Sequence, residues 1–149
     1  MMSKRGFACL IVALLIGADE PKKDETARDV ERFQGVWTLL SLENNGESAT
    51  REALQGRKLI VTRNDSVFIQ GDKVYSRSRQ KLDATKSPRQ VDITQSEGAE
   101  KDKVTKGIYV LDGDDLTICY IYPGDGRPTE FKAGKGSGCI LLKFRREKR

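Results

Sequence analysis

Residues 58–82, KLIVTRNDSVFIQGDKVYSRSRQKL, contain three short runs of alternating side chains separated by Asn64-Asp65 and Gly71-Asp72. A period of two is typical of β-strands, because successive side chains point to opposite faces of a sheet. Asn, Asp and Gly are favoured in the tight turns that join antiparallel strands. The stretch therefore predicts three consecutive antiparallel strands. We expect them over residues 58–63, 66–70 and 73–82.

The same period continues on both sides of this stretch. Further strands are expected over residues 35–41, 91–94, 103–111, 116–122 and 139–144. Asp112-Gly113 predicts a hairpin, because both central residues of that turn prefer a positive φ. One or two short helices are expected near the N-terminus, over 26–33 with Thr26 as N-cap and over 47–55. About eight strands without helices between them indicate an all-β, antiparallel fold, either a closed barrel or a sandwich.

The N-terminus has the order of a secretory signal. Lys4 and Arg5 precede ten uncharged, mostly apolar residues, 7–16, and Gly17-Ala18 follows. Ten residues are too few to cross a bilayer, which needs about 20. We therefore expect residues 1–18 to be a signal peptide that is cleaved after Ala18, and no stable membrane span once it is removed. Because Ile16 stands where a small residue is preferred, an uncleaved signal anchor is the alternative.

The remaining chain is long enough for one domain with its own core. Residues 19–25 are charged, contain Pro21 and lack an apolar period, so we expect a flexible leader there and the folded domain over 26–149. An exported domain would be secreted or would reside in the periplasm or cell envelope. In that oxidising compartment, Cys119 and Cys139 can form one disulfide, or they can remain two buried free thiols.

Composition excludes several function classes. The net charge of +5 falls to +3 without residues 1–18, since 25 basic and 22 acidic side chains remain, and this balance predicts no nucleic-acid partner. The chain contains no histidine, which removes imidazole-based catalysis and histidine-bound metals. No pair of Asp, Glu, Lys, Tyr or Cys has a spacing that suggests acid–base catalysis. We expect a protein that is not an enzyme and that binds no cofactor and no metal.

Two segments are candidate ligand-binding sites. Tyr75, Arg77 and Arg79 alternate along one strand, so they can face the interior and meet an anionic group, or they can face solvent. The loop that contains Arg127 and Phe131 can form a binding lip, or it can be a turn in which Arg127 pairs with Glu130 and Phe131 caps the core.

The start of the first strand resembles that of lipocalins and fatty-acid-binding proteins, in which a glycine stands two residues before a tryptophan. Here these residues are Gly35 and Trp37. In that superfamily the tryptophan closes one end of a barrel and stacks on a basic residue of the last strand. The resemblance implies that Gly35 and Trp37 form this structural signature with Arg145, or failing it with Arg146.

Most of the chain after residue 18 resembles a bacterial family of lipocalin-like domain proteins found in planctomycetes. The matching segments are 82–83, 86–88, 91–94, 107–109, 111–114, 116–119, 123–124, 127–131 and 136–138. The resemblance implies a lipocalin-like barrel and a secreted or envelope location, and it carries no assigned activity.

Two functions follow as hypotheses. The first is a non-enzymatic binding module that holds a small apolar or amphiphilic molecule at the open end of the barrel. The alternative is a structural or protein-interaction domain of the cell envelope whose barrel is filled by side chains. The first hypothesis predicts an internal cavity and the second predicts none of ligand size; neither specifies the ligand or the oligomeric state.

Overall fold

The computed structural model describes residues 21–148, with side chains from Asp24 onward. The expected signal peptide and the first two residues of the expected leader lie outside the described residues. The helices and strands, in chain order, are α1 (Pro21–Phe33), β1 (Gly35–Asn44), β2 (Glu47–Ser48), α2 (Arg51–Leu54), β3 (Arg57–Thr62), β4 (Asp65–Gln70), β5 (Lys73–Asp83), β6 (Arg89–Gln95), β7 (Val104–Asp112), β8 (Asp115–Ile121) and β9 (Cys139–Arg146).

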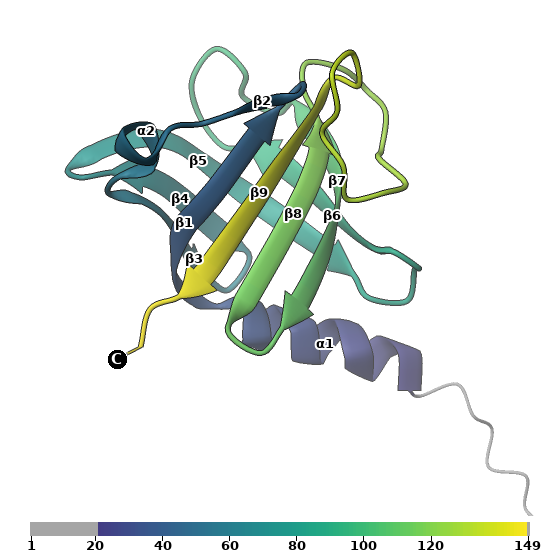
Figure 1. Ribbon diagram of the computed structural model, residues 1–149. Coiled ribbons are helices and arrows are strands. Elements are labelled where there is room, and N and C mark those ends of the chain that lie inside the picture. The colour runs from purple at the N-terminus through teal and green to yellow at the C-terminus, as the bar shows by residue number, and fades with distance from the viewer. Residues whose placement is uncertain (1–20, 149) are drawn as a thin grey trace, which may run out of the picture.

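Eight of the strands close into a barrel. They follow one another in the order β1-β3-β4-β5-β6-β7-β8-β9, and β9 pairs with β1 again, with every pairing antiparallel. The two-residue strand β2 pairs with the end of β1 and takes no part in the closure. Figure 1 shows the resulting ring of tilted strands. The predicted all-β antiparallel barrel of about eight strands is confirmed, and the sandwich alternative is wrong.

The helix α1 lies across one end of the barrel, against β5 and β7 (Figure 1). It begins at Pro21 rather than at Thr26, so the predicted N-cap is wrong and residues 21–25 of the expected leader are helical. Proline is well tolerated at the first helical position, where no amide hydrogen is needed. Thr26 instead accepts a hydrogen bond from the backbone nitrogen of Ala84, 3.0 Å away. This contact joins α1 to the loop that follows β5.

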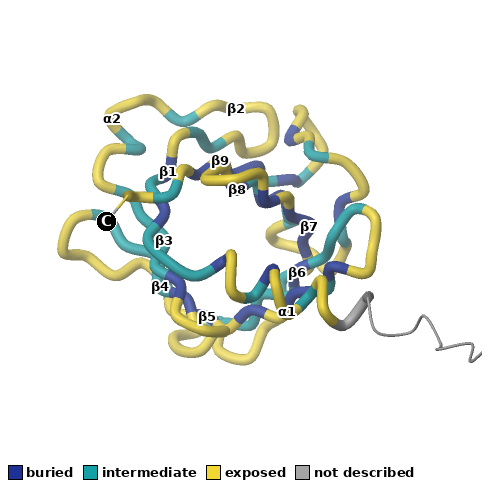
Figure 2. Tube along the Cα trace, turned by 90° about the horizontal axis from the view of Figure 1, so that it is seen from below, coloured by how far each residue is buried: buried dark blue, intermediate teal, exposed yellow. Residues whose placement is uncertain are grey.

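The packed core fills the half of the barrel next to α1. Figure 2 views the ring from this end and shows buried residues along most of the strands. Trp37, Tyr109 and Phe144 are among the largest fully buried side chains, and Phe33 reaches them from the end of α1. A second, smaller apolar cluster lies on the outer face of β7, β8 and β9, beneath the segment 122–138. The opposite half of the barrel interior is less filled.

No helix among residues 21–148 has the length and apolar character needed to traverse a lipid bilayer.

Candidate functional site

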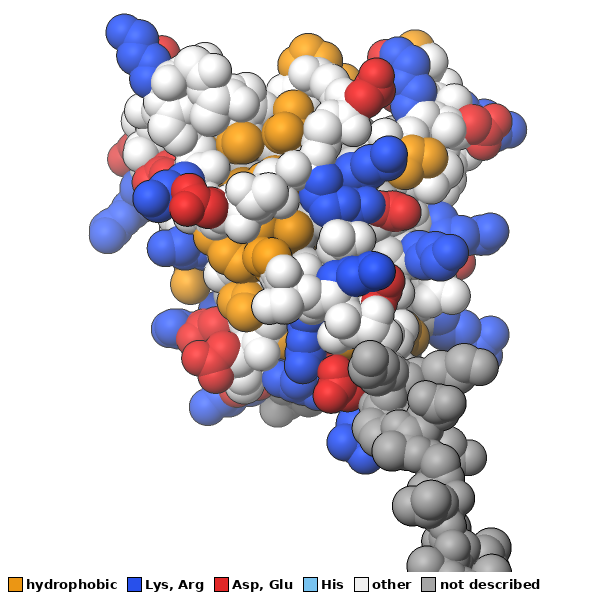
Figure 3. All heavy atoms as spheres, turned by 90° about the vertical axis from the view of Figure 1, so that its right-hand side faces the viewer, with side chains coloured by type: hydrophobic (Ala, Val, Ile, Leu, Met, Phe, Trp, Pro, Cys, Tyr) orange, Lys and Arg blue, Asp and Glu red, His pale blue; other side chains and the backbone are white. Residues whose placement is uncertain are grey.

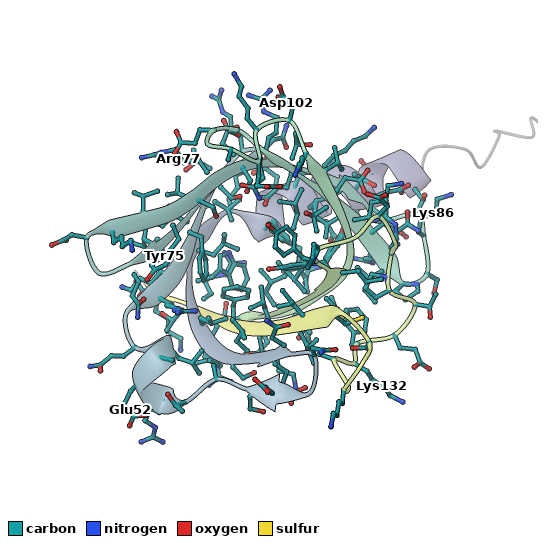
Figure 4. The ribbon with its side chains drawn as sticks, turned by 90° about the horizontal axis from the view of Figure 1, so that it is seen from above. Glu52, Tyr75, Arg77, Lys86, Asp102 and Lys132 are labelled. Atoms are coloured by element: carbon teal, nitrogen blue, oxygen red, sulfur yellow. The ribbon has the colours of Figure 1, made fainter. Side chains whose placement is uncertain are left out.

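The barrel interior contains a cavity of about 510 Å³ at the end away from α1. Its apolar wall includes Leu42, Leu59, Phe68, Ile93, Ile118 and Leu142. Figure 4 looks down into this end, with side chains converging on the middle of the ring. The volume lies within the range of roughly 300–1,000 Å³ that is usual for small-molecule sites. This cavity is the candidate functional site.

A small polar group forms the floor of the cavity. Along β5, Ser78 and Gln80 face inward, and the next inward residue is the core residue Leu82. Ser66 on β4 lies directly opposite Ser78, and their Oγ atoms are 2.8 Å apart. Gln80 is 7% exposed, and its Nε2 has no hydrogen-bond partner among the described residues. Gln80, the deepest of these polar side chains, therefore lies one inward-facing position farther from α1 than the packed core.

The mouth of the cavity carries paired charges. Arg77 on β5 forms an ion pair with Glu97 at 3.4 Å, and Lys103 pairs with Glu100 at 2.7 Å. Arg77, Glu97 and Glu100 all border the cavity. Glu97 and Glu100 lie in the loop between β6 and β7, and each has a basic partner, so the mouth has no net charge from these four groups.

The strand β5 contains an irregularity that changes which residues share a face. Val74 pairs with Ile69 and Ser76 pairs with Phe68, so Tyr75 is an extra residue between two registers. The Tyr75 ring packs edge-on against Phe68, and its hydroxyl donates to Gln70 Oε1 at 2.9 Å. A bulge of this kind re-aims one side chain. Tyr75 therefore borders the cavity mouth, as Figure 4 shows from above.

The hypothesis that Arg77 and Arg79 face inward is wrong, and the solvent-facing alternative is correct. Ser78 and Gln80 are buried, whereas Arg77 and Arg79 are exposed on the other face. Arg79 pairs with Asp65 at 3.2 Å outside the barrel. Arg77 reaches only the mouth, and Figure 4 shows it at the outer rim of the ring. Long charged side chains stay in solvent because burial without a partner is costly.

Arg127 binds to the outside of the barrel. Its guanidinium donates to Asp92 Oδ1 at 2.6 Å and to the carbonyl oxygens of Gly107 at 2.7 Å and Val91 at 3.2 Å. The expected pairing with Glu130 is wrong, because Glu130 lies 3.8 Å from Lys132. Arg127 thus fastens the segment 122–138 to β6 and β7, and it does not border the cavity.

Phe131 packs against the outer apolar cluster, together with Ile121. It therefore covers the outside of the sheet rather than the main core or the cavity. Figure 3 shows the side of the molecule on which this segment lies, with hydrophobic side chains surrounded by basic and acidic ones in mixture. Neither Arg127 nor Phe131 forms a lip of the cavity.

Trp37 stacks with the second of the two candidate arginines. The guanidinium carbon of Arg146 lies 4.2 Å from the centre of the Trp37 ring, and the register pairs these two residues. Arg145 is opposite Thr38 and forms an exposed ion pair with Asp115 at 3.1 Å. Arg145 is therefore corrected to Arg146, because only the latter shares the inward face with Trp37.

Gly35 is required by this arrangement. Its φ is +126°, a backbone conformation that side chains disfavour. A Cβ at Gly35 would also lie 3.0 Å from Nη1 of Arg146. Arg146 donates to the carbonyl oxygens of Gln34 and Arg32, so its guanidinium ties the end of α1 to the last strand. Gly35 and Trp37 therefore belong to the same set of contacts, which closes this end of the barrel.

Sequence reasoning missed a buried carboxylate in α1. Asp29 is 1% exposed, and its Oδ2 accepts hydrogen bonds from the Tyr109 hydroxyl at 2.7 Å and from Arg89 Nη1 at 2.6 Å. Burial and the bond to Asp29 raise the pKa of Tyr109 above its ordinary value. The sequence contained one indication of this burial. Asp29 lies one helical turn before the apolar Phe33, on the same face of the helix.

Cys119 and Cys139 are free, buried thiols in the outer apolar cluster. Cys119 pairs in register with Leu141, and Cys139 with Ile121, so the two lie diagonally on the adjacent strands β8 and β9. Burial, and secondarily the neighbouring Cys139, raises the pKa of Cys119 to about 11. The structure therefore agrees with the alternative of two buried free thiols and not with the disulfide.

The other candidate sites are less favourable than the cavity. Within residues 24–148 no group of three or more His, Cys, Asp or Glu side chains is arranged to hold a metal ion. Two acids of the β7–β8 turn pair with arginines, Asp114 with Arg146 at 3.4 Å and Asp115 with Arg145 at 3.1 Å. A hollow of about 660 Å³ between β1 and α2 is larger than the cavity, but it lies on the outer surface and is more open.

Comparisons of this chain with protein-family models, with curated proteins and with solved structures return no match. The functional assignment therefore depends on the geometry of the barrel and its cavity.

Proposed function

We propose that this protein is an exported, lipocalin-like binding protein that holds a small apolar or amphiphilic molecule in its barrel. The observation that carries the proposal is the cavity of about 510 Å³, whose wall is mainly apolar with a few converging polar groups. That combination is typical of small-molecule sites. The stacking of Arg146 on Trp37 at the closed end is consistent with the lipocalin-like part of the proposal.

The distribution of side-chain sizes along the barrel favours a ligand over a filled interior. Near α1 the inward positions hold large side chains such as Trp37 and Tyr109. Farther from α1 they include Ser66, Ser78 and Thr105, which border the cavity. Empty volume inside a protein costs stability in proportion to its size. A barrel that served only as an envelope or interaction scaffold would gain by filling this space, so the binding module is the better hypothesis.

The cavity residues also favour binding over catalysis. Burial raises the pKa of Tyr120 to about 12, so its phenol stays neutral at physiological pH and cannot serve as a base. Ser66 and Ser78 bond to each other, and activation of a serine requires a neighbouring base. The carboxylates of Glu97 and Glu100 are at the mouth, in ion pairs. We therefore propose a protein that is not an enzyme.

Binding of the neutral fluorescent dye N-phenyl-1-naphthylamine tests the proposed function. We expect a saturable rise in dye fluorescence with the wild-type protein. Ser76→Phe places a ring in the cavity, where Ser76 is a wall residue, and should weaken dye binding by about tenfold or more. Lys81→Phe, on the exposed face of the same strand, is the matched control and should bind as the wild type does. Absence of saturable binding, or equal losses in both variants, would refute the proposal.

Export is tested separately, by expressing the full chain in a bacterial host and sequencing the N-terminus of the protein found outside the cytoplasm. We expect a mature chain that begins at Asp19. A protein that stays in the cytoplasm with residues 1–18 attached would contradict the exported location and leave the cavity proposal to the dye experiment.

A further inference from the structure

We infer that the ligand is uncharged and carries a hydrogen-bond acceptor of the carbonyl class, as in a ketone, ester or amide, which it buries at the cavity floor beside Gln80. Its apolar body then extends along the wall toward the mouth. This inference rests on the proposed function and specifies the chemistry of the ligand and its orientation.

The first support is the buried amide of Gln80. Its side chain borders the cavity, is more than nine-tenths buried, and its Nε2 lacks a hydrogen-bond partner among the described residues. A buried donor without a partner is costly to a folded protein. Nε2 has almost no exposed surface in the free protein, so no water meets it there. A rotation of the Gln80 side chain on binding would bring Nε2 to a carbonyl oxygen of the ligand, which supplies the missing acceptor.

The second support is a second donor on the same wall. Ser66 and Ser78 share one hydrogen bond between their Oγ atoms, at 2.8 Å. One hydroxyl hydrogen lies in that bond, so the other is available to a third group. Ser78 is two residues from Gln80 on β5, which places both on the inward face. The floor therefore presents an amide donor and a hydroxyl donor to the same region.

The third support is the distribution of charge. Of the described residues that border the cavity, Arg77 alone is basic, and it pairs with Glu97 at the mouth. An anion at the floor beside Gln80 would have no opposite charge to offset the loss of its hydration, which is large for an ionised carboxylate. The ion pairs of Glu97 and Glu100 at the mouth leave no net positive charge there to attract an anion. A neutral acceptor meets the donors without this cost.

The orientation follows from where polar and apolar groups lie. Gln80 pairs with Ile93, one inward step above Leu82 and Val91 of the packed core. Apolar residues such as Leu59 and Phe68 form the wall beside the floor. A ligand that met Gln80 would therefore enter with its polar end first and bury its apolar chain against the wall.

Titration of the ¹⁵N-labelled protein with 2-decanone and with decanoate at pH 8 tests the inference. The two probes have ten carbons each, and one is a neutral ketone whereas the other is a carboxylate anion. We expect 2-decanone to bind at least tenfold more tightly than decanoate. The side-chain amide signal of Gln80, identified by its absence in Gln80→Leu, should move on addition of the ketone.

Gln80→Leu should weaken 2-decanone binding by about three- to tenfold, the effect of one neutral hydrogen bond. The same variant should unfold at a temperature no lower than the wild type, because it removes a buried amide that lacks a partner. A residue with a merely structural role would not combine weaker binding with unchanged or higher stability. Gln90→Leu makes the same substitution on the adjacent strand β6, at a residue that does not border the cavity, and should change the affinity by less than about twofold.

The outcomes separate this inference from the proposed function. If decanoate binds as tightly as 2-decanone, or if Gln80→Leu leaves ketone affinity unchanged, the ligand class is wrong while dye binding still supports a binding protein. If the dye binds and neither ten-carbon probe does, the ligand class is again wrong. If neither the dye nor either probe binds, both the inference and the proposed function are refuted.

Discussion

Replacement of Asp29 by alanine should destabilise the protein strongly, because this carboxylate joins α1 to the barrel. Asp29 accepts hydrogen bonds from Tyr109 on β7 and from Arg89 on β6. Its Oδ1 is also 3.4 Å from Arg32 of the same helix. The substitution leaves a buried phenol hydroxyl without this acceptor and removes the negative charge between two arginines.

The magnitude follows from the burial of each partner. Breaking a fully buried ion pair costs about 3–5 kcal/mol. The Arg89 side chain is 35% exposed, so water can partly solvate it, and the lower end of that range applies. Tyr109 is fully buried, and its unpaired hydroxyl contributes about 1–3 kcal/mol of that loss. We therefore expect the free energy of unfolding to fall by about 3 kcal/mol.

Urea unfolding followed by tryptophan fluorescence measures this loss, since Trp37 is buried in the same half of the barrel. With a slope of about 2 kcal/mol per molar urea, the midpoint should fall by about 1.5 M. Asp24→Ala is the control, because Asp24 and its partner Arg28 are 66% and 73% exposed on the same helix. It should change stability by less than about 0.5 kcal/mol. A loss below about 1 kcal/mol for Asp29→Ala, or equal losses in both variants, would show that Asp29 does not anchor the helix.

Three further predictions concern the closed end and the outer cluster. Arg146→Ala should lower the urea midpoint more than Arg145→Ala, because only Arg146 stacks on Trp37; equal effects would contradict the assignment. Since the pKa of Cys119 is raised from 9.0 to about 11, iodoacetamide should alkylate the folded protein slowly at pH 9 and faster toward pH 11. The Cys119 thiol ionises at a lower pH in the unfolded chain than in the folded protein. Its contribution to the free energy of unfolding is therefore complete below pH 9 and is lost as the pH rises through 11. Arg127→Ala should loosen the covering segment and speed alkylation at pH 9, and an unchanged rate would mean that Arg127 does not hold the segment closed.

Local patterns predicted the strands well. The runs at 58–63, 66–70 and 73–82 correspond to β3, β4 and β5, and their turns fall where Asn, Asp and Gly occur. These features depend on neighbouring residues, so a single sequence contains them. The start of α1 was predicted less well, because its contact between Thr26 and Ala84 spans 58 residues.

The candidate site was predicted poorly, because a strand pattern does not specify which of its two faces is inward. On β5 the extra residue Tyr75 separates two registers, and Ser78 and Gln80 face inward instead of Arg77. A shift of one residue exchanges the two faces of a strand. The pairing of Arg127 with Glu130 was expected from proximity along the chain. The actual partner, Asp92, is 35 residues away.

By itself, the sequence determined that this chain forms short antiparallel strands, because alternation and turn chemistry act between neighbours in the chain. The closed ring, the hollow above the core and the pairing of Asp29 with residues 60 and 80 positions away were decided only by tertiary structure. Such features depend on strand register and on contacts between distant segments. The polar floor at Gln80 belongs to this second class, and the proposed ligand chemistry depends on it.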